Sequence, residues 1–346
     1  MTDRAGANGG LLAGVDVGGS KIAVVLATPD LELVARHTIG TAVGDASRAV
    51  TLIAEAIDAT LAMAGRPAAD LTAIGIGVPG RVDPVAGRVT LAVNLGWHDL
   101  PLVRLVSDRY GIPVTIENDV RAAAAGLHAR RVLPDVGDLA YLSIGTGISA
   151  GVVLDGRLHR GVRGLAGEIG HVVLDPTGPV CQCGLHGCFE ALASGRAVGA
   201  QAEAALEAGR ISSLAAHRPV TAVDVYREAA AGDVLAISIA DTAGRWVARA
   251  VHELVMTYDV RRVVLGGGVA GAGDTFLAPV LRALDALRSA SELAREALPP
   301  DVVYLLPPDA DAGGWGAVIL ARSAAAAGSA RRAGQVKVPG REVATG

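Results

Sequence analysis

The chain has 346 residues and a formal net charge of −4; 51% of its residues are hydrophobic and 3% are aromatic. This length exceeds what one hydrophobic core usually supports, so two lobes are expected. The sequence has neither a basic cluster for a nucleic-acid backbone nor an apolar run of about 18 residues for a membrane span. Residues 1–10 are polar and Gly-rich without the apolar segment of a signal peptide, which predicts a flexible N-terminus and a cytoplasmic protein.

The first motif along the chain is a Gly turn between apolar runs. Residues 11–17, 22–27 and 31–36 are largely apolar, which predicts three strands joined by turns. The first turn reads Asp16-Val17-Gly18-Gly19-Ser20-Lys21. Backbone N–H groups in such a turn can bind phosphate, and the Asp16 carboxylate can orient a hydrated Mg²⁺. Most Gly-Gly turns are only turns, however, and this spacing is not that of a Walker A loop.

An acidic cluster follows a later strand. The predicted strand at 114–116 ends in Glu117-Asn118-Asp119, and an Ala-rich helix begins at Val120. Catalytic groups collect at the C-terminal ends of strands in open α/β sheets, whereas Asn118 or Asp119 can also simply cap the helix. Both interpretations stay open on this pattern alone. The stretch before the cluster predicts helices over 46–64 and 100–110, a strand over 73–78 and a loop over 94–97.

The strand–turn–strand pattern recurs once. The largely apolar residues 138–142 and the run 149–154 enclose Ser143-Ile144-Gly145-Thr146-Gly147-Ile148, and Asp155-Gly156 then makes a tight turn. The separation from the first copy is far longer than a solenoid repeat. Two such hairpins predict a duplicated α/β domain with two phosphate-binding turns.

All three cysteines, Cys181, Cys183 and Cys188, lie within eight positions, and His171 stands ten residues before the first of them. One His and three Cys form the ligand set of a closed structural zinc site. A disulfide is one alternative, although it would leave one thiol over, and three unrelated thiols are another. His186 lies inside the loop, where closure on the same ion would be cramped, so His171 is preferred as the fourth ligand.

Two glutamates bracket this stretch. Glu168 precedes His171 by three residues, and Glu190 follows Cys188 by two. A metal site flanked by carboxylates suggests a rigid frame that holds polar groups toward a ligand.

The last third of the chain holds another Gly cluster. The pattern predicts helices over 194–208 and 233–258, strands over 261–265 and 302–306, and a helix from Asp274. Gly266-Gly267-Gly268 follows the first of these strands and lets a flat ligand, for which adenine is the candidate, approach the backbone closely. A final helix is expected over 317–321, and residues 323–346 lose periodicity, which predicts a disordered tail.

Taken together, these motifs resemble the ROK family (repressor, open reading frame, kinase), and the pattern is most similar to its bacterial glucokinases. The turns at Asp16 and Ser143 resemble the two phosphate motifs of the family, and Gly266-Gly267-Gly268-Val269 resembles its adenosine motif. Residues 167–171 with 181–190 resemble the family signature and zinc site. The resemblance covers about residues 12–321.

The resemblance implies a two-lobed α/β protein with the actin-like ATPase and hexokinase (ribonuclease H-like) fold. The small lobe would comprise residues 11–120 with 307–322, and the large lobe residues 121–306 with the zinc-binding loop 167–190. It also implies Asp119 as catalytic base, structural Zn²⁺, and ATP with Mg²⁺ as cofactors.

The resemblance further assigns three sets of ligands. The implied sugar contacts are Asn94, Asn118, Asp119, Glu168, His171 and Glu190. The implied ATP contacts are Asp16, Gly18, Gly19, Ser20, Lys21, Gly145, Thr146, Gly147, Gly266, Gly267 and Gly268. The implied zinc ligands are His171, Cys181, Cys183 and Cys188. Two departures from the family pattern are Ser20, where Thr is usual, and the absence of a Pro before Asn94.

The implied activity is ATP-dependent phosphorylation of a hexose, with glucose at its 6-hydroxyl preferred, by a homodimer or homotetramer that binds neither nucleic acid nor membrane. Fructose, mannose, allose or an N-acetylhexosamine are alternative substrates, and polyphosphate is an alternative donor. A transcriptional repressor is disfavoured because only some fifteen residues precede Asp16, too few for a DNA-binding domain. A sugar sensor without activity would not need Asp119 and both phosphate turns.

Overall fold

The computed structural model describes residues 10–41, 44 and 46–334. These residues form two compact units. The first unit ends at Ala122 and resumes at Gly313, and the second runs from Ala123 to Ala312. The predicted flexible N-terminus falls almost entirely outside the described residues.

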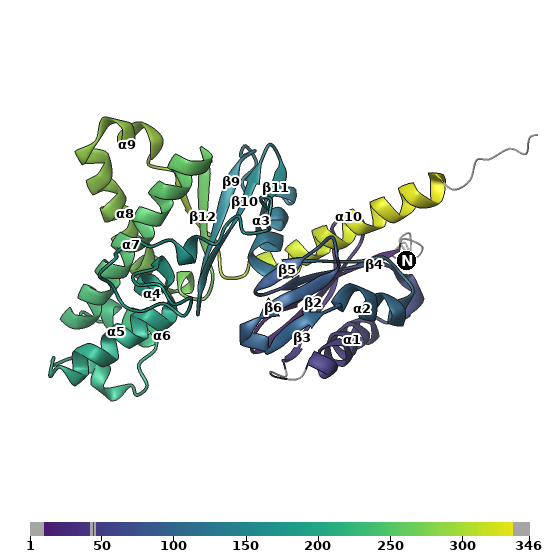
Figure 1. Ribbon diagram of the computed structural model, residues 1–346, viewed down its shortest axis with the longest axis horizontal. Coiled ribbons are helices and arrows are strands. Elements are labelled where there is room, and N and C mark those ends of the chain that lie inside the picture. Colours follow the sequence, from purple (N-terminus) through teal and green to yellow (C-terminus); the bar gives the residue numbers. More distant parts are fainter. Residues whose placement is uncertain (1–9, 42–43, 45, 335–346) are drawn as a thin grey trace, which may run out of the picture. The chain divides into compact units, whose positions relative to one another are not determined.

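The first unit is built on a five-stranded sheet in the order β3-β2-β1-β4-β8 (Figure 1). The central strand β1 pairs antiparallel with β2 and parallel with β4, and β4 pairs parallel with β8. The strands are β1 Leu11–Val17, β2 Lys21–Ala27, β3 Leu33–Gly40, β4 Leu71–Val78 and β8 Val114–Asn118.

Helices cover both faces of this sheet (Figure 1). Side chains alternate across a strand, so Val15 of β1 enters the core formed with α1 (Ala46–Met63) and α2 (Leu102–Tyr110). Leu12 points to the opposite face and packs with Trp315 and Val318 of α10 (Ala312–Gly334). A Cβ added to Gly14 would lie 2.4 Å from the Val318 backbone nitrogen, so glycine is required for α10 to approach β1 this closely.

The second unit repeats this plan with the strand order β11-β10-β9-β12-β13. Here β9 pairs antiparallel with β10 and parallel with β12, and β12 pairs parallel with β13. The strands are β9 Leu139–Ile144, β10 Ile148–Leu154, β11 Arg157–His159, β12 Arg262–Gly266 and β13 Val303–Leu305. The shared order and directions confirm the duplication that the sequence predicted.

One large core holds the helices of the second unit on its sheet. The longest of them, α7 (Val234–Tyr258), buries Gly244 against Pro279 of α8 (Asp274–Ala290), where an added Cβ would lie 2.4 Å from the proline ring. The other helices are α4 Phe189–Ala193, α5 Gly195–Glu207, α6 Ala222–Ala230, α8 Asp274–Ala290 and α9 Glu292–Ala297. Helix α3 (Asp119–Ala129) begins in the first unit and ends in the second.

A small antiparallel sheet in the first unit was not expected. It consists of β5 (Arg81–Asp83), β6 (Arg88–Ala92) and β7 (Trp97–Leu100). The predicted loop over 94–97 is therefore wrong at Trp97, which pairs with Ala92 and is fully buried in the core. Asn94 lies in the short 3₁₀ helix Val93–Leu95. Further 3₁₀ turns are Ala68–Asp70, Ile169–His171, Ser213–Ala216 and Ala270–Ala272.

The predicted disordered tail over 323–346 was wrong for its first twelve residues. Helix α10 starts at Ala312 and continues to Gly334, so residues 323–334 are helical and not a disordered tail. Ala has the highest helix propensity, which sustains a helix even where apolar periodicity is lost, and Ala324 and Ala325 still pack against the core. Residues 335–346 lie outside the described part of the chain. None of the described helices has the length and apolar character to span a bilayer.

Candidate functional site

In the first unit, two aspartates flank Gly77 of β4. An ideal Cβ on Gly77 would lie 3.5 Å from the Asp119 Cα and 3.7 Å from the Asp16 Oδ1. Asp16 is on β1, and Asp119 opens α3 directly after β8. Because parallel strands place their C-terminal ends at one edge of a sheet, the fold brings together two residues that are 103 positions apart in sequence.

The Asp16 carboxylate also meets the start of α10. A Cβ on Gly313 would lie 2.3 Å from Asp16 Oδ2, so a larger residue there would displace the carboxylate or the helix. The positive end of the α10 dipole favours an anion at this position. Asp16 thus lies close to the start of α10 and, across Gly77, to Asp119.

Asn118 orients Asp119 and caps α3 at the same time. Its Oδ1 accepts hydrogen bonds from the backbone nitrogens of Val120 and Arg121, both at 3.1 Å. Its Nδ2 donates to Asp119 Oδ1 at 2.9 Å and to the Gly80 carbonyl at 3.2 Å. The cap interpretation therefore holds for Asn118, and its side-chain amide simultaneously fixes the carboxylate of Asp119.

A buried ion pair lies next to this cap. Glu117 Oε1 accepts from Arg121 Nε at 2.9 Å, and the two side chains are 0% and 3% exposed. The same Glu117 oxygen accepts the backbone N–H of Asn118 at 2.9 Å. Since the ion pair joins the end of β8 to the first turn of α3, it locks the backbone that presents Asp119.

The first Gly turn is open to solvent. The Gly18 N–H donates to the Lys21 carbonyl at 2.8 Å, and Gly19, Ser20 and Lys21 are exposed. No described atom lies within 4 Å of a Cβ built on Gly19. Asn94, a predicted sugar contact of the same unit, is also exposed.

The second Gly turn is enclosed by three other segments. The Gly195 N–H at the start of α5 donates to the Gly145 carbonyl at 2.8 Å. Glu190 Oε2 accepts the Ile148 N–H at 2.9 Å and would lie 2.6 Å from a Cβ on Gly147. Gly267, with a positive φ of 87°, lets its segment approach so closely that a Cβ would lie 2.5 Å from the Ile144 carbonyl oxygen.

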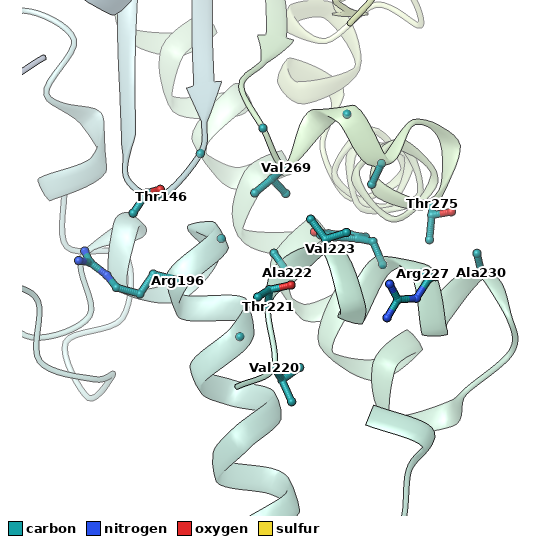
Figure 2. A pocket seen from close by; sticks show the side chains of 17 residues that line it. Thr146, Arg196, Val220, Thr221, Ala222, Val223, Arg227, Ala230, Val269 and Thr275 are labelled. Atoms are coloured by element: carbon teal, nitrogen blue, oxygen red, sulfur yellow. The ribbon is translucent and has the colours of Figure 1, made fainter. Parts of the chain in front are cut away.

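A cavity of about 800 Å³ opens beside this turn, entirely within the second unit. Its wall includes Gly145, Thr146 and Gly268, three of the predicted ATP contacts (Figure 2). Most of the remaining wall was missed by sequence reasoning and comes from or next to α5, α6, α8 and the 3₁₀ turn Ala270–Ala272. The side chains missed there include Arg196, Thr221, Val223, Arg227 and Thr275, whereas Val269 belongs to the predicted adenosine motif. The S/T-x-x-D pattern of Thr221 and Asp224, which forms a capping box, is the signal that could have located α6.

The four predicted zinc ligands come together. Their ligand atoms lie within 4.8 Å of one another, with His171 Nδ1 3.7 Å from Cys181 Sγ and Cys183 Sγ 3.5 Å from Cys188 Sγ. A tetrahedral zinc ion with bonds of about 2.0–2.3 Å sets its ligand atoms about 3.5–3.8 Å apart. The residues therefore fit this ion, and the disulfide alternative is wrong because all three cysteines are free.

Two thiols of the cluster have pKa values that are shifted in opposite directions. Burial, with the nearby Cys183 and Cys181, raises the pKa of Cys188 to about 12. A backbone hydrogen bond at Leu185 lowers the pKa of Cys183. Zinc binds cysteine as the thiolate, so metal binding at this cluster would release thiol protons. His186 is directed elsewhere, since its Nδ1 lies 3.2 Å from the Gly178 carbonyl oxygen.

Glycines explain why Glu168 and His171 lie against β10. A Cβ would lie 1.8 Å from the Ala150 carbonyl oxygen at Gly167, and 2.1 Å from the Ile148 carbonyl oxygen at Gly170. Only glycine permits such contacts, and they press the Glu168–His171 segment onto the strand that follows the second turn. Glu190, in α4, reaches the same strand through its bond to Ile148.

Comparison with known proteins agrees with these features. The ROK family model matches residues 12–324. A glucokinase of Halalkalibacterium halodurans is 34% identical over 79% of this chain and 84% of its own length. A putative xylose repressor of a Caldicellulosiruptor species is 32% identical over 80% of this chain and 70% of its own length.

Among solved structures, a ROK family glucokinase from Streptomyces griseus in complex with glucose and AMPPNP superimposes with a TM-score of 0.76. It is 30% identical, and the match covers 91% of this chain and all of the other. The fold class expected from the resemblance, the hexokinase-type duplicated α/β fold with a Cys₃His loop, is thereby confirmed. The chain belongs to the ROK family.

Proposed function

We propose that this protein is an ATP-dependent hexose kinase that phosphorylates glucose at its 6-hydroxyl. The observation that carries the proposal is the cavity beside the Gly145–Thr146 turn, because a turn that can bind phosphate opens directly into a space large enough for a nucleoside. The similarity to glucokinases supports glucose as the acceptor.

The wall of the cavity favours ATP over polyphosphate as the donor. Beyond the turn the cavity is lined by apolar groups such as Val223, Val269 and Ala272. A purine and ribose would bury their surface against these side chains, whereas polyphosphate has no apolar part to fill the space. The Gly266–Gly268 segment would let the base approach the backbone.

Asp119 is the proposed general base. As the sugar hydroxyl oxygen bonds to the γ-phosphorus, its proton passes to the Asp119 carboxylate, and the bond to the β–γ bridging oxygen breaks, so ADP leaves. Asn118 keeps the carboxylate in place, and the Glu117–Arg121 pair secures the backbone beneath it. Mg²⁺, when bound, would neutralise phosphate charge; carboxylates are its preferred protein ligands, so Asp16 is the residue proposed to hold its hydration shell.

The proposed sugar contacts are Asn94, Asn118, Asp119, Glu168, His171 and Glu190. Because His171 turns Nδ1 toward the cysteines, Nε2 is the nitrogen proposed for a sugar hydroxyl. Zinc held by His171 and the three cysteines would have no open position for substrate, so its proposed role is to brace the loop that carries Glu190. A cytoplasmic dimer or tetramer stays a prediction.

A panel of hexoses with ATP or polyphosphate, followed by a coupled ADP assay and by direct detection of the sugar phosphate, tests the proposal. We expect glucose and ATP to give the highest kcat/KM. Higher kcat/KM for N-acetylmannosamine, fructose, mannose or allose would correct the substrate, and turnover with polyphosphate alone would correct the donor.

The similarity to a repressor supports a second candidate, a sugar-responsive regulator. Hexose binding by calorimetry without phosphorylation of any hexose in the panel would favour it and would overturn the kinase proposal.

A further inference from the structure

Arg196 is a cationic residue that the predicted site did not include. It is the second residue of α5 and lines both the cavity of about 800 Å³ and a smaller one of about 220 Å³ beside the zinc loop. Its side chain is 44% exposed and lies at the same end of the larger cavity as Thr146 (Figure 2). A cation therefore stands where a phosphate-binding turn meets the cavity.

The start of α5 is fixed to that turn. The Gly195 N–H donates to the Gly145 carbonyl, and a Cβ on Gly195 would come within 3.1 Å of both this oxygen and Val269. Ser194 caps the helix by accepting the Ala197 N–H at 3.2 Å. Arg196 thus projects from a helix end whose position relative to Gly145 and Thr146 is set by hydrogen bonds and close packing.

Glu190 orients the arginine. Arg196 Nη2 donates to Glu190 Oε1 at 3.4 Å, while Glu190 Oε2 accepts the Ile148 N–H at the other end of the turn. The Glu190 side chain is only 13% exposed, so it is the anchored partner of the pair. Guanidinium carries five N–H donors, and one long bond to Glu190 leaves capacity for an incoming anion.

The second arginine of the cavity is differently placed. Arg227 Nη2 donates to Asp224 at 2.6 Å, and Arg227 Nε lies 3.4 Å from Glu228. Two carboxylates therefore balance its charge. Figure 2 also shows it near Ala230, on the side of the cavity away from Thr146. The charge at the phosphate-turn end of the cavity comes from Arg196.

We propose that Arg196 binds the terminal phosphates of the nucleotide and that Glu190 positions it to do so. The inference rests on the proposed function, since it takes the nucleotide to lie in this cavity. The planar guanidinium fork matches two phosphate oxygens at once, a contact that adenosine does not offer. Glu190, which orients Arg196, lies two residues after Cys188. The zinc-bearing loop therefore carries the residue that positions the phosphate-binding arginine.

The test compares wild type with Arg196→Gln, Arg196→Lys and a control, Arg249→Gln, which removes an exposed arginine paired with Glu253 on α7 away from the cavity lining. Calorimetry with Mg²⁺ measures the affinity for adenosine and for a non-hydrolysable ATP analogue. Arg196→Gln is expected to lower the affinity for the analogue about 10- to 100-fold and the affinity for adenosine less than about 3-fold. Arg196→Lys should recover part of the loss, and Arg249→Gln should bind both ligands as wild type does.

Thermal unfolding and zinc content verify that each variant is folded with its loop intact. Equal loss of adenosine and analogue affinity in Arg196→Gln would mean a purely structural role, and no loss would mean that Arg196 touches no phosphate; either result overturns the inference alone. A wild-type protein that binds neither ligand would overturn the proposed function and this inference with it.

Discussion

The two Gly turns look like copies in the sequence, but they differ in what supports them. The turn at Gly18 is closed by its own hairpin and by Thr41, which donates to the Gly18 and Ser20 carbonyls, and it stands exposed, with space around Gly19. The turn at Gly145 is contacted by Glu190, by the start of α5 and by the Gly267 segment. Duplication has preserved the hairpin and not its surroundings, so each unit adds its own chemistry to a common sheet.

In the first unit, the buried polar side chains support Asp119 and not the Gly turn. Its ion pair Glu117–Arg121 and the Asn118 cap stand behind Asp119, at the end of β8. The corresponding edge strand of the second unit, β13, is short and half-buried, and the described interactions there include no such pair. In the proposed function, the first unit supplies the base and the second unit supplies the nucleotide cavity and the Cys₃His loop.

The largest effect is expected from Asp119→Asn, which removes the base and leaves the second turn unchanged. We expect kcat to fall about 10²- to 10⁴-fold. Steady-state kinetics with glucose and ATP measure this, and calorimetry of the ATP analogue should show nearly wild-type affinity. An unchanged kcat would contradict the assignment of Asp119 as the general base.

Arg121→Leu tests the support behind the base. Loss of one partner of a buried ion pair costs about 3–5 kcal/mol because the other charge stays buried. Urea denaturation should show this destabilisation. The double variant with Glu117→Gln should recover part of it, and equal stability of the single variant and wild type would contradict the ion pair as a structural lock.

Cys183→Ser tests the proposed role of zinc in stabilising the loop that carries Glu190. Removal of a ligand should lower bound zinc below one equivalent and raise the KM for glucose about 10- to 100-fold through Glu190 and His171. Elemental analysis and kinetics report the two effects. A variant with normal KM, stability and zinc content would contradict this structural role of zinc.

The smallest effect is expected from a matched pair of glycine substitutions. The Cβ introduced by Gly147→Ala would lie 2.6 Å from Glu190 Oε2. It should break the hydrogen bond between Glu190 and Ile148 and lower the unfolding free energy by about 1–2 kcal/mol. Gly19→Ala meets open space and should change stability by less than about 0.5 kcal/mol. Equal destabilisation of both variants would remove the distinction between the turns.

Local patterns predicted much of the fold. Alternation and Gly turns located β1, β2, β9 and β10, and helical spacing located α1 and α7. The sequence analysis missed α6, although a capping box and helical spacing mark it. It also missed the β5–β6–β7 sheet, whose short segments carry little periodicity. The end of α10 was missed because an Ala-rich helix needs no apolar stripe to persist.

The sequence by itself determined the chemistry that depends on residue type and close spacing: the zinc ligand set, the two Gly turns and the Glu117-Asn118-Asp119 cluster. Only the tertiary structure decided what surrounds them. It made Asn118 a cap and a support, joined Glu190 to Ile148, and brought Arg196 to the same end of the cavity as Thr146. The cap itself is local, but the Glu190–Ile148 bond and the cavity wall shared by Arg196 and Thr146 join segments that are distant in the chain. Such pairings follow from strand order and helix packing, which local periodicity does not encode.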